Sequence, residues 1–164
     1  MLKLYGAAII AASLSIVSIE SSAAPKESQS AIASEIKADV GEIIAGINSK
    51  DIGKATRFDA PELVSMESGR EPSVGAKADR DGLSMAFKYA PSWHLRLIDE
   101  TVDVAKAGDM AIYRGTYAED SMRDGVPYTH TGNYVAEFRR DPDGMWRLHW
   151  SVIAWQSPSK KKGA

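Results

Sequence analysis

The sequence predicts an α+β domain in which helices cover one face of an antiparallel sheet. An apolar stripe with helical spacing occupies the first part of the chain, and four strand-like runs separated by short turns occupy the last part. The length of 164 residues is enough for one domain with its own core. A composition of 44% hydrophobic and 26% charged residues is typical of a globular protein and excludes whole-chain disorder.

The charge balance and the missing cysteines exclude several classes of function. The net charge of −2 argues against a dedicated nucleic-acid binder, which normally carries a basic face. No cysteine is present, so disulfides, thiolate metal sites and a cysteine nucleophile are excluded. His94, His130 and His149 share no close ligand spacing, so we expect neither a metal site nor a cofactor.

Residues 1–23 are typical of a secretory signal peptide. Lys3 gives a positive start, residues 7–17 are uncharged and mostly apolar, and residues 21–23 are small, as a cleavage site requires. The apolar run is shorter than the about 20 residues that cross a bilayer, so we expect no stable membrane anchor. The sequence therefore predicts a periplasmic or secreted protein.

The remaining chain divides into three parts. A polar lead-in at residues 24–33 precedes the domain at residues 34–156. Residues 157–164 form a polar tail with three lysines, for which solvated disorder is the expected state.

The first element of the domain is a long helix that begins near Ser30 and ends at Asn48 and Ser49. Apolar side chains recur at spacings of four, four, three and four residues: Ile32, Ile36, Val40, Ile43 and Ile47. This spacing places them on one helix face. A short second helix over Asp51–Phe58 and a short strand over Leu63–Glu67 are expected to follow.

A third helix, capped by Asp79 or Asp81, is expected to run to Pro91, after a loop marked by Gly69 and Gly75. Four strands then follow: Ser92–Val104, Met110–Glu119, Val126–Arg140 and Met145–Trp155. Their short turns predict an antiparallel meander.

The turns predict which strand residues lie opposite each other. A two-residue turn at 124–125 pairs Arg123 with Val126. A turn with a glycine bulge at 141–144 extends to pair Glu137 with His149. Further pairs follow from the two registers: Thr116 with Asn133, Arg114 with Val135, Ile112 with Glu137, Val135 with Ser151, Asn133 with Ile153, and Thr131 with Trp155.

These registers predict one mixed face and one aromatic face. The mixed face carries Arg114, Thr116, Thr131, Asn133, Val135, Glu137, His149, Ser151, Ile153 and Trp155. The aromatic face carries Tyr113, Tyr117, Tyr134, Ala136, Phe138, Leu148, Trp150 and Val152. By composition alone the aromatic face is the core face, but a single β-bulge would reverse the assignment beyond it.

Several short strings stand in the same order as the predicted elements: Lys50-Asp51, Phe58-Asp59-Ala60, Gly108-Asp109-Met110-Ala111, Gly132-Asn133-Tyr134-Val135, Phe138-Arg139-Arg140, and Asp143 to Leu148. With these strings the chain resembles the nuclear-transport-factor-2-like superfamily, which includes ketosteroid-isomerase-like and SnoaL-like proteins. The resemblance implies a curved antiparallel sheet wrapped around a long N-terminal helix, with a cone-shaped apolar pocket. It also implies a homodimer formed through the outer sheet face.

The resemblance implies that the mixed face lines the pocket and that the aromatic face is partly a dimer interface. Ser151, Ile153 and Trp155 fall on pocket positions, and Asn133 falls where ketosteroid isomerases carry an oxyanion-hole acid. Arg114 lies diagonally across from His149 in the predicted register and is a candidate for binding an anion.

The residues of the isomerase reaction are not matched in this chain. The isomerase tyrosine falls near Ile43, and its general base falls near Ser65 or Met66, none of which is a titratable base. Glu67 is the nearest carboxylate that could substitute.

The remaining catalytic candidates are Glu137 and His149, because a carboxylate beside an imidazole fixes its tautomer and raises its basicity. The alternative is a solvated cross-strand pair, which contributes only ~0.2–1 kcal/mol.

The first hypothesis is therefore an exported protein that binds an apolar or amphipathic small molecule. The alternatives are an isomerase- or dehydratase-like enzyme using general acid/base catalysis, and a structural dimer or accessory module.

Overall fold

The fold was analysed in a computed structural model that describes residues 27–123 and 125–156. The predicted signal peptide and tail lie outside the described residues. The elements are α1 (Gln29–Ser49), α2 (Ile52–Ala55), β1 (Asp59–Glu67), β2 (Ser73–Val74), α3 (Ala76–Tyr89), β3 (His94–Val104), β4 (Met110–Arg123), β5 (Val126–Arg140) and β6 (Trp146–Trp155). No helix in these residues is long and apolar enough to span a membrane.

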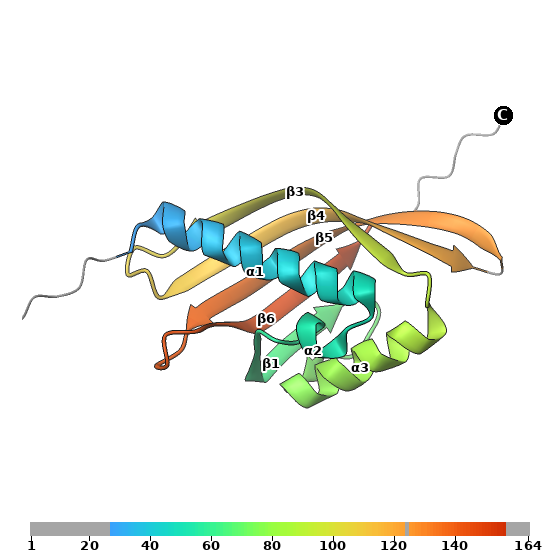
Figure 1. Ribbon diagram of the computed structural model, residues 1–164, viewed down its shortest axis with the longest axis horizontal. Coiled ribbons are helices and arrows are strands. Elements are labelled where there is room, and N and C mark those ends of the chain that lie inside the picture. Colours follow the sequence, from blue (N-terminus) through green and yellow to red (C-terminus); the bar gives the residue numbers. More distant parts are fainter. Residues whose placement is uncertain (1–26, 124, 157–164) are drawn as a thin grey trace, which may run out of the picture.

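The six strands form one open sheet in the order β2-β1-β6-β5-β4-β3. The predicted antiparallel meander is confirmed for β3 to β6. The sheet is nevertheless mixed, because β1 pairs with β6 in parallel. The first strand of the chain therefore lies beside the last, next to the helices α2 and α3 (Figure 1).

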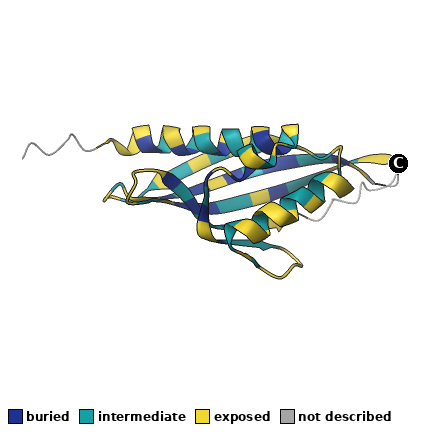
Figure 2. Cartoon of the chain, turned by 60° about the horizontal axis from the view of Figure 1, so that its bottom comes forward, coloured by how far each residue is buried: buried dark blue, intermediate teal, exposed yellow. Residues whose placement is uncertain are grey.

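Helix α1 confirms the long helix predicted from the apolar stripe. The Ser28 side chain caps its start by accepting a hydrogen bond from the Ala31 N–H at 3.1 Å. Lys50 ends it in the left-handed conformation, with φ of 59°. The buried stripe of this helix, which includes Ile32 from the predicted lead-in, packs on the sheet (Figure 2).

The second and third helices differ from the prediction. α2 covers only residues 52–55, because β1 begins at Asp59, four residues before the predicted strand. α3 begins at Ala76, so neither Asp79 nor Asp81 is its cap. The predicted loop before it contains the two-residue strand β2.

The predicted register is confirmed between β4 and β5 and is wrong between β5 and β6. β4 and β5 pair as predicted, from Arg123 with Val126 to Ile112 with Glu137. Between β5 and β6 a bulge lies after Glu137, which pairs with Trp150 instead of His149. The other predicted β5–β6 pairs are also displaced by one residue: Val135 pairs with Val152, Asn133 with Ala154, and Gly132 with Trp155.

The bulge changes which residues share the inner face, which we define as the sheet face covered by α1. Ser151, Ile153 and Trp155 now lie beside Ala136, Tyr134 and Gly132. These pair in turn with Tyr113, Gly115 and Tyr117. The inner face therefore combines the tyrosines of β4 and β5 with the end of β6, and both predicted faces were wrong in part.

Candidate functional site

A cavity of about 150 Å³ lies between α1, α3 and the inner face of the sheet. Helix α1 contributes the aliphatic side chains Val40, Ile43, Ile44 and Ile47 to its wall. Apolar cavities of about this size can hold a ring as large as benzene. The cavity is thus a candidate site for a small apolar group.

The opposite wall of the cavity is aromatic. The rings of Tyr113 and Tyr134 are 6.0 Å apart, and those of Tyr117 and Trp155 are 5.6 Å apart. Gly115 makes room for this arrangement, because a Cβ atom there would lie 2.8 Å from the Tyr113 hydroxyl oxygen. A bulkier residue at 115 would have to displace the ring.

The Tyr113 hydroxyl and the Trp155 indole nitrogen each donate to a carboxylate. Tyr113 donates to Glu100 Oε2 at 3.1 Å, and Trp155 Nε1 donates to Glu67 Oε1 at 2.8 Å. Burial is the largest of the effects that raise the pKa of Tyr113, Tyr117 and Tyr134. These tyrosines are therefore neutral hydrogen-bonding groups.

A chain of hydroxyls crosses the inner face and ends on a carboxylate. Tyr134 is hydrogen-bonded to Ser151. The Ser151 Oγ donates to Ser65 Oγ at 3.3 Å, and Ser65 is hydrogen-bonded to Asp79. The chain thus links β5, β6 and β1 to helix α3. It gives an otherwise apolar cavity one polar end.

Two carboxyl groups, Asp59 from β1 and Asp79 from α3, line the cavity at this end. Burial and the nearby charge of Asp79 raise the pKa of Asp59 to about 7, although Arg80 opposes the shift. Burial also raises the pKa of Asp79, in part offset by the hydrogen bond from Ser65. Asp59 Oδ2 is buried and has no hydrogen-bond partner.

A wider groove of about 890 Å³ adjoins the cavity and shares Asp79, Leu83 and Trp155 with it. Its rim carries Glu119 and His130. Burial raises the pKa of Glu119, while His130 lowers it. Helix α3 forms one side of both spaces and has no buried residue, so it is loosely packed.

Comparison with known proteins identifies the fold. No protein-family model matches the sequence, and no curated protein matches it. A nuclear transport factor 2-like superfamily protein from Salmonella enterica superposes with a TM-score of 0.71 at 15% identity, over 84% of this chain and 100% of that one. This chain has the nuclear-transport-factor-2-like fold.

Two further solved structures share this fold. A protein with a cystatin-like fold from Novosphingobium aromaticivorans has a TM-score of 0.65 at 20% identity, covering 77% of this chain and 83% of that one. A ketosteroid isomerase-like protein from Erwinia carotovora has a TM-score of 0.57 at 19% identity, covering 75% and 95%. At such identities the likeness concerns the fold alone.

Within the nuclear-transport-factor-2-like fold, the predicted pocket residues separate into two groups. Ser151, Ile153 and Trp155 line the cavity. Asn133 and Arg114 lie on the outer face, so their predicted place in the pocket is wrong. There Asn133 Oδ1 accepts from the Thr116 hydroxyl at 3.4 Å, and Arg114 pairs with Asp103 at 2.6 Å.

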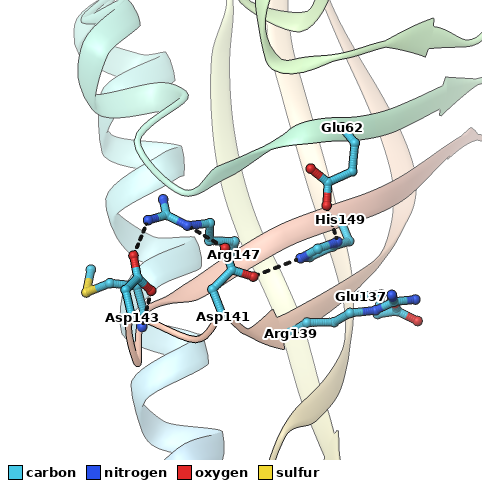
Figure 3. Close-up of polar contacts among 8 residues, drawn as sticks. Glu62, Glu137, Arg139, Asp141, Asp143, Arg147 and His149 are labelled. Carbon is cyan, nitrogen blue, oxygen red and sulfur yellow. Dashed lines mark hydrogen bonds and ion pairs between the residues drawn. The ribbon is translucent and has the colours of Figure 1, made fainter.

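Glu137 and His149 do not face each other (Figure 3). His149 lies 3.3 Å from Glu62 and 3.4 Å from Asp141, while Glu137 accepts from Arg139 Nε at 2.5 Å. The bulge after Glu137 explains the separation, because it moves His149 out of the predicted pair. The predicted dyad is therefore not formed.

Sequence reasoning missed the two carboxyl groups of the cavity and left open on which side its three tyrosines lie. Asp59 stood in one of the strings behind the family resemblance, and Asp79 was considered only as a helix cap. Their shared place depends on β1 pairing with β6 and on where α3 crosses, which no local pattern encodes. The three tyrosines were assigned to the correct strands; composition placed them on the core face, where they lie, whereas the resemblance placed them on the outer face.

Proposed function

We propose that this chain is an exported protein that binds an apolar or amphipathic small molecule in the cavity beneath α1 and α3. The observation that carries this proposal is the cavity itself, with aliphatic and aromatic walls and a few polar groups at one end. Residues 1–23 support export, because they are typical of a signal peptide.

Binding of toluene tests whether the cavity accepts a ring. We expect toluene to raise the melting temperature of the purified chain, because a ligand that binds only the folded state stabilises it. Leu83→Trp fills the cavity from α3 and should remove the effect. Met85→Trp is the matched control, because Met85 lies on the same helix and lines only the outer groove.

The result in the unmodified chain decides the proposal. No change of melting temperature at saturating toluene, with both variants folded, would show that the cavity is not a binding site. An equal stabilisation of the Leu83→Trp and Met85→Trp variants would place toluene elsewhere on the molecule.

A second candidate function is an isomerase- or dehydratase-like enzyme that uses general acid/base catalysis. The buried carboxyl groups of Asp59 and Asp79 favour it, since a proton-transfer group needs a pKa near the working pH. Exchange of the protons beside the carbonyl of cyclohexanone, followed by NMR in D₂O, tests this function. Asp79→Asn should slow a catalysed exchange and His149→Ala should not, and exchange no faster than in buffer would reject it.

We also propose that two copies associate through the outer sheet face. Ile112, Val135, Trp150 and Val152 lie on that face and are half-buried in the single chain. Sedimentation velocity tests the association, which Trp150→Glu should abolish while Arg114→Ala, on the same face, leaves it. A monomer at all concentrations would also remove the alternative of a structural dimer.

A further inference from the structure

We propose that the ligand of the cavity is a protonated amine on a small apolar body, held by the carboxyl groups of Asp59 and Asp79. This inference rests on the proposed binding function and names the chemical class of its ligand. The charge of the cavity wall, the unpartnered oxygen of Asp59 and the aromatic rings all point to a cation.

The charged groups of the cavity wall are all acidic. Asp59 and Asp79 line the cavity, and within the described residues no lysine, arginine or histidine does. Arg80, the next residue on α3, is exposed and does not line the space. An anionic ligand would meet two carboxyl groups without a compensating cation, whereas a cation would relieve their repulsion.

The unpartnered oxygen calls for a donor. Asp59 Oδ2 is buried without a hydrogen bond, a state that costs free energy unless a ligand or water supplies a donor. An ammonium group carries three N–H donors, enough for both carboxyl groups, while an alcohol carries one. Hydrogen bonds between an ammonium and a carboxylate are also stronger than those between neutral groups.

The aromatic wall suits an organic cation rather than a bare metal ion. Five aromatic side chains line the cavity: Trp93, Tyr113, Tyr117, Tyr134 and Trp155. Aromatic rings attract ammonium groups through the negative charge of their faces. The aliphatic side chains of α1 then contact the apolar body of the ligand.

Amine binding should depend on pH through Asp59. The groups that act on Asp59 come from two elements: burial within β1 and the charge of Asp79 on α3 raise its pKa to about 7, and Arg80 on α3 lowers it. The charge of Asp59 also acts on Tyr134 of β5, which stays neutral because burial raises its pKa. Below pH 7 the amine must expel a proton from Asp59, so its affinity should fall.

Calorimetric titration with benzylamine, benzyl alcohol and toluene tests the inference on the full chain. The three probes share a ring and differ in charge and donors. We expect benzylamine to bind at least about tenfold more tightly than benzyl alcohol near pH 8, and this preference to shrink near pH 5.5. Benzylamine remains protonated at both pH values, as alkyl amines do.

Two variants assign the preference to the carboxyl groups. Asp59→Asn and Asp79→Asn should each lower the affinity for benzylamine relative to toluene by about tenfold. Asp81→Asn is the control, because Asp81 is exposed on α3 and pairs with Lys77. If either variant fails to fold, the comparison of the three probes in the unmodified chain still decides.

The possible outcomes distinguish the preference for an amine from the proposed binding of a small molecule in the cavity. Binding of toluene without any preference for benzylamine would overturn the amine and leave the binding function intact. Binding of none of the three probes would overturn both. A benzylamine preference that survives both Asp variants, or that persists in Leu83→Trp, would place the amine outside the cavity and also overturn the inference.

Discussion

Gly46 and Gly41 lie on the same helix but differ in what surrounds them. A Cβ atom at Gly46 would lie 2.4 Å from the Ala55 backbone nitrogen, whereas one at Gly41 would have nothing within 4 Å. Gly46 is therefore needed for the close approach of α1 and α2. Gly41 has no such role and only lowers the helix propensity.

Alanine at these two positions should have opposite effects on stability. We expect Gly46→Ala to lower the free energy of unfolding by about 2 kcal/mol or more, because backbone atoms must move. Gly41→Ala should raise it by about 0.5–1 kcal/mol through helix propensity. Urea denaturation measures both, and a stabilised Gly46→Ala variant would contradict the close contact.

Asp59 should make the protein less stable as the pH rises. The pKa of Asp59 is about 7 in the folded protein, whereas an unperturbed aspartate has a pKa of 3.8. The folded state therefore holds the proton more tightly than the unfolded state. The stabilisation is complete below about pH 4 and is lost as the pH rises through 7. Asp59→Asn should therefore be more stable than the unmodified chain by about 1–3 kcal/mol near pH 8.

The same comparison near pH 4 provides the control for Asp59. There both side chains are neutral in the folded state, and the difference in the free energy of unfolding should nearly vanish. Asp81→Asn should show no such dependence, because Asp81 is exposed. A difference that stays constant between pH 4 and pH 8 would argue against a buried, protonated Asp59.

At the scale of elements, α1 and α3 cover the same cavity with different packing. α1 buries Ile32, Ile36, Val40 and Ile47, while α3 has no buried residue. α3 also displays Met85 and Tyr89 to solvent, the latter 82% exposed. Helices that bury little apolar surface open locally at a small cost in free energy.

Hydrogen exchange should reveal this difference between the helices. We expect the backbone amides of residues 80–89 in α3 to exchange at least about tenfold faster than those of residues 36–47 in α1. A cavity ligand should slow exchange in α3 and change α1 little, because Asp79 and Leu83 line the cavity from α3. Equal protection of both helices without a ligand would show that α3 is firmly packed.

The β-bulge at His149 is a feature of the sheet that the sequence did not predict. Helix α1, the strands of the meander and the β4–β5 register follow from local spacing and from one turn. The shift of one residue after Glu137 follows from packing across the whole sheet, and it decides whether Ser151 or Trp150 of β6 faces the cavity on the side of Tyr134. Local patterns therefore predicted the elements and missed half of the site.

At the scale of the whole molecule, the cavity is a void that the fold maintains. Unfolding removes internal voids, so pressure favours the unfolded state in proportion to the void volume. We expect Leu83→Trp to reduce the magnitude of the negative volume change of unfolding, because the indole occupies part of about 150 Å³. NMR at high pressure measures this change, and Met85→Trp should leave it unaltered.

The parallel pairing of β1 with β6 has a consequence for how the chain reaches its native state. In the sheet β1 has only β6 and the two-residue β2 as neighbours, and 78 residues separate the end of β1 from the start of β6. A ribosome must therefore synthesise β6 before β1 can take its place beside it. The wall that joins Ser65 to Ser151 is thus completed only after the last strand of the sheet has been synthesised.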